Sequence, residues 1–255
     1  MPSFGASAAW GLLVAGSLVA GAVVAALFRI PKRLAASISA FGGGILLAAV
    51  AVDLVPEAAE HAGRLPTAVG LLTGTIVFVA ADAWLTRDNS MEATRRFRHA
   101  IAAGRSMTQR PAHSEAARGE SIAAGLFVDG VPESLALGFT VAEGSLARAL
   151  LAGIVIGNVV EAYGAAQPII AGGHRRSFAL GLLAGIGSAL AAATIAGGTL
   201  LAGAAPPIIG SAQAVAAGAV LAVVSISIIP HAFNEVSRLC AFGAASGFVA
   251  GFLLH

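Results

Sequence analysis

Long apolar runs separated by short polar breaks make up most of this 255-residue chain. A helix needs about 20 apolar residues to cross the hydrocarbon core of a bilayer, and the runs are about 16 to 25 residues long. The pattern therefore predicts eight transmembrane helices, with the last one the shortest. They are Ala8–Phe28, Leu34–Glu57, Thr67–Leu85, Ser121–Val141, Leu146–Ile170, Phe178–Ala202, Ala212–Ala232 and Leu239–Leu254.

The composition agrees with an all-α membrane protein. Hydrophobic residues make up 57% of the chain and charged residues only 11%, with a mean hydropathy of +0.86. A soluble domain carries about 25% charged residues, so a soluble fold is excluded. The first apolar run is long and lacks a basic region before it, so it is interpreted as a span and not as a cleavable signal. We expect a single transmembrane domain over residues 1–255.

The basic residues predict how the chain is oriented. Thirteen of the 15 lysines and arginines fall in the odd-numbered connections between the predicted helices, and only Arg64 and Arg148 fall in the even-numbered ones. Cytoplasmic connections are enriched in Lys and Arg, so both termini are predicted to lie outside. The net charge of +2 reflects this bias, and the expected partner is the lipid bilayer, with no nucleic acid.

A polar segment with seven arginines separates the third predicted helix from the fourth. It runs from about residue 86 to residue 120 and holds few large apolar side chains. We expect a flexible cytoplasmic loop here.

Small residues occur throughout the predicted spans, for example at Gly42–Gly44, Gly181–Gly187 and Gly197–Gly198. In lipid, small residues let helix backbones approach closely, so close packing is their expected role. The single cysteine, Cys240, excludes an intramolecular disulfide and a metal site built from several thiolates.

The chemistry of the chain is concentrated in acidic side chains at bilayer depth. Asp129 and Glu133 lie four residues apart in the fourth span, so they share one helix face. Pro132 lies between them and lacks a backbone N–H, which is expected to bend the helix. An ionised side chain at the bilayer centre costs roughly 2.5–3.5 kcal/mol on insertion scales, so such residues normally face a compensating partner.

The fifth span carries a second polar group near its middle. Asn158 and Glu161 are three residues apart and again lie on one face. No Lys or Arg is close in sequence to either polar group, so a cation is the expected compensation. Three carboxylates and one carboxamide on consecutive helices predict a divalent-cation site with Asp129, Glu133, Asn158 and Glu161 as ligands.

Two further groups flank this predicted site. Asp53 and Glu57, with Pro56 between them, repeat the acid–proline–acid pattern near the outer end of the second span. They are candidates for an outer gate or access site, or for an exposed acidic helix end. His231 follows Pro230 near the inner end of the seventh span and is either an inner metal ligand or an interfacial histidine.

These residues together resemble the ZIP (Zrt/Irt-like) family of divalent metal transporters. The segment Asp129-Gly130-Val131-Pro132-Glu133-Ser134 is similar to the family's His-Asn-x-Pro-Glu-Gly in the fourth span. The stretch from Asp53 to Glu57 resembles His-Leu-x-Pro-Glu, and Asn158 to Glu161 resembles Ser-Asn-x-Pro-Glu with Val160 replacing the proline. His231 stands where the family's seventh span has Ile-Pro-Glu.

The chain also departs from the family pattern. The fourth and fifth spans carry no histidine, and Ser188 and Ser225–Ser227 stand near the places of acids in the sixth and seventh spans. The resemblance implies a fold of two helix bundles and transport of zinc toward the cytoplasm across the inner (plasma) membrane. It also implies a homodimer. Oxygen ligands favour manganese or iron(II) as well.

No catalysis and no resident cofactor are expected, since the divalent metal is the transported substrate. Two alternatives stay open. One is a transport-inactive protein of the same fold that binds metal or a partner. The other is an intramembrane hydrolase that uses an acid pair sharing a proton.

Overall fold

The computed structural model of the protein describes residues 2–102, 112–143, 148–201 and 203–255. Over these ranges the chain is almost entirely helical and forms no β-strand. The elements are α1 (Pro2–Leu27), α2 (Lys32–Ala48), η1 (Ala49–Leu54), α3 (Val55–Ala62), α4 (Arg64–Ala102), α5 (Ala112–Glu143), α6 (Arg148–Ala171), α7 (Arg176–Leu200), α8 (Pro206–Val223), η2 (Val224–Ile228), α9 (Ile229–Val236) and α10 (Leu239–Leu254). The segments η1 and η2 are π-helical.

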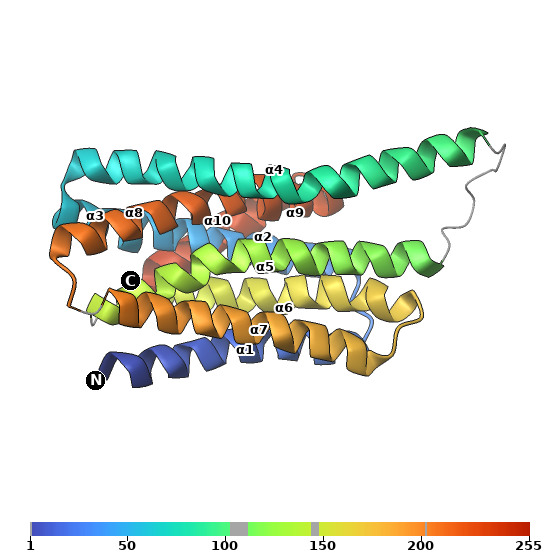
Figure 1. Ribbon diagram of the computed structural model, residues 1–255, viewed down its shortest axis with the longest axis horizontal. Coiled ribbons are helices and arrows are strands. Elements are labelled where there is room, and N and C mark those ends of the chain that lie inside the picture. Colours follow the sequence, from blue (N-terminus) through green and yellow to red (C-terminus); the bar gives the residue numbers. More distant parts are fainter. Residues whose placement is uncertain (1, 103–111, 144–147, 202) are drawn as a thin grey trace.

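The described residues contain seven helices long and apolar enough to cross a membrane, if α2–η1–α3 and α8–η2–α9 each count as one. They overlap the first seven predicted spans, so the prediction of an all-α membrane protein is confirmed. The predicted ends at Leu146 and Ala202 lie outside the described residues. The short apolar helix α10 matches the eighth predicted span, whose crossing of the membrane stays a prediction. The beginning of α1 and the end of α10 lie at the same end of the bundle (Figure 1).

The predicted loop at residues 86–120 is wrong at both of its ends. Helix α4 continues to Ala102 and extends past the neighbouring helices (Figure 1), and α5 begins at Ala112. Residues 86–102 contain no glycine or proline and are rich in good helix formers, so their polarity alone does not end the helix. Residues 103–111, in the middle of the predicted loop, lie outside the described residues.

The helices pack in two groups. Helices α1, α5, α6 and α7 pack against one another, and α2, α3, α4, α8, α9 and α10 form a second group. The two groups meet mainly where α2 packs on α6 and where α5 packs on α8. One hydrophobic cluster spans both, with Leu18, Leu150 and Leu183 on the first side and Leu46 and Val220 on the second.

Close contact between helix backbones holds the second group together. A methyl group added at Gly74 of α4 would overlap the carbonyl of Val215 in α8, and one at Gly218 would overlap the carbonyl of Leu71. The Thr75 hydroxyl donates a hydrogen bond across this contact to the Gly218 carbonyl, at 3.0 Å. The expected role of glycines in close packing is therefore confirmed here.

The two π-helical segments occupy matching positions in the two interrupted helices. Each is followed by a short helix with proline in its first turn, Pro56 in α3 and Pro230 in α9. Proline has no N–H to donate, so the carbonyl one turn earlier loses its usual partner and the helix is locally widened. Asp53 stands three residues before the first proline and Ser227 three residues before the second. Both positions therefore place a polar side chain beside an irregular helix turn.

Candidate functional site

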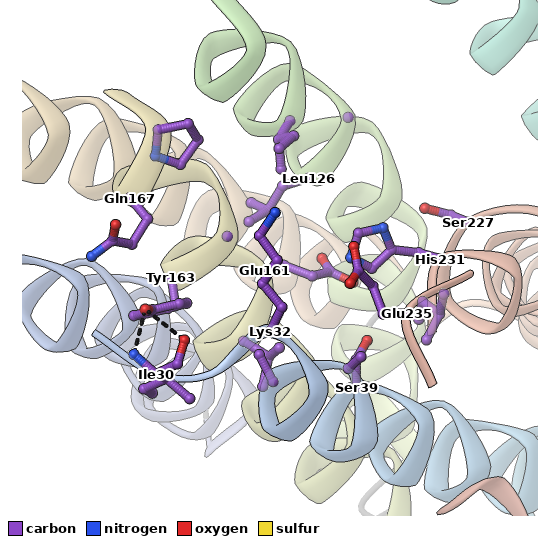
Figure 2. Close-up of a pocket in the computed structure, with 18 of the residues that line it drawn as sticks. Ile30, Lys32, Ser39, Leu126, Glu161, Tyr163, Gln167, Ser227, His231 and Glu235 are labelled. Carbon is purple, nitrogen blue, oxygen red and sulfur yellow. Dashed lines mark hydrogen bonds between the residues drawn. The ribbon is translucent and has the colours of Figure 1, made fainter. Parts of the chain in front are cut away.

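A cavity of about 720 Å³ lies where the two groups of helices meet. Its wall is formed by the α1–α2 connection and the first half of α2, by α5 and α6, and by η2 and α9 (Figure 2). The exposed residues Arg29 and Lys32 line it, and so does Asp129, which is only 8% exposed. The cavity thus extends from the end of the bundle that carries the α1–α2 connection into the space between the helices. This is the end for which the basic residues predict a cytoplasmic location.

Asp129 is the acidic side chain of α5 at the inner wall of the cavity. Its Oδ2 accepts a hydrogen bond of 2.9 Å from the Ser227 hydroxyl of η2. This bond joins the first group of helices to the second. Glu133 follows one turn later on α5 and is 5% exposed, so both carboxyl groups lie in the protein interior as their spacing predicts.

Helix α6 contributes Glu161 and Asn158. Glu161 lines the cavity and reaches into it from α6 (Figure 2), so this predicted ligand does not face lipid. Asn158 is one turn deeper and only 3% exposed. Its Nδ2 finds no hydrogen-bond partner among the described residues, which leaves a buried carboxamide with unused bonding capacity.

The three carboxylates influence one another electrostatically. The charges of Asp129 and Glu133 both act on Glu161, and that of Asp129 acts on Glu133. Like charges in a low-dielectric interior repel strongly, so the arrangement favours a cation. In this conformation the described residues contain no group of three or more His, Cys, Asp or Glu side chains arranged to hold a metal ion. The four-ligand site therefore stays a prediction.

Helix α9 adds His231 and Glu235 to the cavity wall (Figure 2). His231 is a predicted site residue, and the cavity brings it together with Asp129 and Glu161. Sequence reasoning missed Glu235 and Ser227. Their spacing from His231 could have identified both. Ser227, His231 and Glu235 follow one another at intervals of four residues, so they share a helix face.

Two side chains of α6 hold the rim of the cavity in place. The Tyr163 hydroxyl accepts a hydrogen bond of 2.7 Å from the backbone N–H of Ile30 in the α1–α2 connection (Figure 2). The Gln167 Nε2 donates to the carbonyl of Ala25 at 3.2 Å, near the end of α1. The second bond satisfies a carbonyl that the end of α1 leaves unpaired, and the first satisfies an N–H of the connection.

The remaining predicted residues, Asp53 and Glu57, are not among the residues that line the cavity. Asp53 lies in η1 against His255, and Glu57 in α3 accepts a hydrogen bond of 3.3 Å from Gln213 Nε2. They lie on the half of the α2–η1–α3 span farther from the α1–α2 connection. Asp53 and Glu57 are therefore separate from the cavity, and their role in an outer gate or access site stays a prediction.

No protein-family model matches the chain, and comparison with curated proteins gives no match either. The fold alone defines the class: an all-helical, multi-pass membrane protein with a cavity between two groups of helices that reaches buried carboxylates.

Proposed function

We propose that this protein is a transporter of divalent metal cations of the ZIP type, which moves its substrate toward the cytoplasm. The observation that carries the proposal is the cavity that joins one end of the bundle to the interior carboxylates Asp129 and Glu161. An interior acidic site with an open route, lined in part by charged side chains, to one side of the membrane is what release of a cation requires.

In this proposal the metal ion is held by Asp129, Glu133, Asn158 and Glu161. These four residues all belong to the first group of helices. His231 and Glu235 belong to the second group and line the release route, whereas Asp53 and Glu57 line the outer route. Location in the inner (plasma) membrane and assembly as a homodimer belong to the same proposal.

Movement of one group of helices against the other would close the cavity and open the site to the opposite side. The hydrogen bond from Ser227 to Asp129 crosses between the groups, so it exists only in relative positions close to the present one. It stabilises the arrangement in which the cavity is open toward the predicted cytoplasmic end.

The test is metal uptake by the purified protein in proteoliposomes. Zinc, manganese, iron(II) and cadmium are supplied separately, and protein-free liposomes are the control. We expect uptake of at least one metal above the control, with zinc favoured by the family resemblance and manganese or iron(II) by the oxygen ligands. Uptake at the protein-free rate for all four metals would contradict the proposal.

The second candidate function is a transport-inactive protein that binds metal or a partner. It is favoured by the serines that stand near the places of the family's acids in the sixth and seventh spans, Ser188 and Ser225–Ser227. Such a protein would bind metal in detergent and yet take up none in proteoliposomes, so the same preparation distinguishes the two. An acid-pair hydrolase is favoured less, because Asp129 is hydrogen-bonded to the Ser227 hydroxyl.

Replacement of Asp129 by histidine is expected to shift metal preference toward zinc. An imidazole suits zinc better than manganese, so adding one nitrogen ligand should raise the zinc-to-manganese uptake ratio. The expected change in this ratio is on the order of tenfold. Substitutions beside a metal ligand change metal affinity by roughly 10–100-fold, and this value is the lower end of that range. Paired uptake of the two metals by wild type and Asp129→His measures it, and an unchanged ratio would remove Asp129 from the ligand set.

A further inference from the structure

The imidazole of His255 lies directly against the carboxylate of Asp53. Nδ1 of His255 and Oδ1 of Asp53 are 2.5 Å apart. The Asp53 side chain is 11% exposed and that of His255 is 54% exposed, so the imidazole covers an otherwise enclosed carboxylate. The cavity at the other end of the bundle contains neither residue.

The packing of α10 on α2 explains why these two residues meet. Gly243, Gly247 and Gly251 recur every four residues along α10. A methyl group on any of them would overlap or crowd α2, at Ala40, at the Phe41 carbonyl and at Ala48 in turn. His255, the residue directly after α10, is the next position in the same series, so it follows the face of α10 that packs on α2 and η1. The close contact between the α10 and α2 backbones therefore fixes the position of the His255 backbone relative to Asp53.

The surroundings of Asp53 are negatively charged. Glu57 lies one turn further along the same span, and its charge acts on Asp53. Glu57 is itself held by the amide of Gln213. An imidazole nitrogen and carboxylate oxygens therefore meet at the end of the bundle remote from the cavity. The matching positions in the other interrupted helix, Ser227 and His231, line the cavity.

We propose that Asp53 and His255 form a second binding site for a divalent cation, with one nitrogen and one oxygen ligand. Two ligands of one metal at bond lengths of 2.0–2.2 Å are roughly 3 Å apart, so a small rotation of the exposed imidazole admits the ion. Water completes the coordination. Mixed imidazole and carboxylate ligands suit zinc and cobalt(II). As a deepening of the proposed transport function, this site captures the metal at the outer side before it reaches the interior acids.

The binding experiment uses the full-length protein with Glu133→Ala and Glu161→Ala, which removes two of the interior ligands. Cobalt(II) is titrated into this protein in detergent and followed by its visible absorption, with zinc as competitor. In the same background we compare His255→Asn with His174→Asn. His174 is a matched control because it also pairs with a carboxylate, Glu120 at 3.6 Å, and is similarly exposed.

We expect His255→Asn to lower the affinity for cobalt(II) at least about tenfold, and His174→Asn to leave it unchanged. Asparagine retains a hydrogen-bond donor for Asp53 but supplies no imidazole, and helix content measured by circular dichroism checks the fold. Equal affinity in the two variants would overturn the proposal, as would the lack of any cobalt binding in the background protein.

Uptake kinetics separate this proposal from the transport function on which its role rests. In an otherwise wild-type chain, His255→Asn should raise the KM for zinc with little change in kcat, because the capture step weakens but the interior site is intact. A contact with a structural role only would not raise KM while leaving kcat unchanged. If wild type shows no uptake, the transport function fails, and the cobalt titration alone decides whether the site exists.

Discussion

Removal of the Glu133 carboxylate is expected to abolish metal uptake. Glu133 is 5% exposed and lies one turn from Asp129 on the face of α5 that carries the interior acids. Its charge acts on Glu161 in α6, as that of Asp129 does, so it belongs to the group of acids that joins the two helices electrostatically. Changes to groups that only support a metal ligand already lower metal affinity 10–100-fold. Loss of a ligand itself should lower the initial rate of uptake by about 100-fold or more.

The measurement is initial uptake by Glu133→Ala in proteoliposomes, with the metal that wild type transports best. Glu133→Gln keeps the volume and hydrogen-bonding capacity of the side chain and removes only its charge, so it should fail as well. Ser134→Ala is the control for the effect of a substitution at a buried position of α5, since Ser134 is the next residue and is fully buried. Its hydroxyl has no hydrogen-bond partner among the described residues, so little stability is lost with it. Wild-type uptake by Glu133→Gln would show that the carboxylate is not needed.

The spans of this protein could be predicted from sequence because crossing a membrane depends on local apolar length. Seven long helices coincide with seven apolar runs for this reason. The end of α4 could not be predicted in the same way, because polarity marks where a chain leaves the membrane and not where a helix ends. Residues 86–102 are polar and yet helical, since no glycine or proline interrupts them.

The candidate site was predictable where it depends on residues of a single helix. Spacings of four and three residues placed Asp129 beside Glu133 and Glu161 beside Asn158, and Asp129 and Glu161 do line the cavity. Partners from distant segments were not predictable. Ser227 lies 98 residues from Asp129 in sequence, and His255 lies 202 residues from Asp53. Such pairs depend on which helices become neighbours, and the apolar pattern of a span does not determine that.

Glycines illustrate the same limit. The sequence predicts close packing for Gly181–Gly187 as much as for any other glycine-rich stretch, yet an added methyl group at Gly181 or Gly185 would meet no atom within 4 Å apart from the backbone of its own helix. At Gly74 and Gly218 it would overlap a backbone carbonyl. In a membrane both the lipid-facing side and the packed side of a helix are apolar, so hydrophobicity does not distinguish them.

This difference predicts opposite effects for one chemical change at two glycines. Replacing glycine with alanine inside a helix normally stabilises it, by up to about 1 kcal/mol. Gly185→Ala on the exposed side of α7 should follow this rule. Gly218→Ala should instead lower the free energy of unfolding by about 3 kcal/mol or more, at or above the upper end of typical overpacking costs. Its methyl group meets the Leu71 backbone, which no side-chain rotation relieves, and the separation it forces lengthens the 3.0 Å bond from Thr75.

Unfolding of the three proteins in mixed micelles of increasing dodecyl sulfate content, followed by circular dichroism, measures both free energies. We expect the transition of Gly218→Ala to shift to much lower dodecyl sulfate than that of wild type, and that of Gly185→Ala to stay level or shift slightly higher. Gly74→Ala approaches the same α4–α8 contact from the other helix and should reproduce the loss. Because these three substitutions are chemically identical, any difference among them reports the local packing and not the residue. Equal stability of Gly218→Ala and Gly185→Ala would mean that α4 and α8 do not touch through their backbones, and the second group of helices would lose the contact that holds α4 in place.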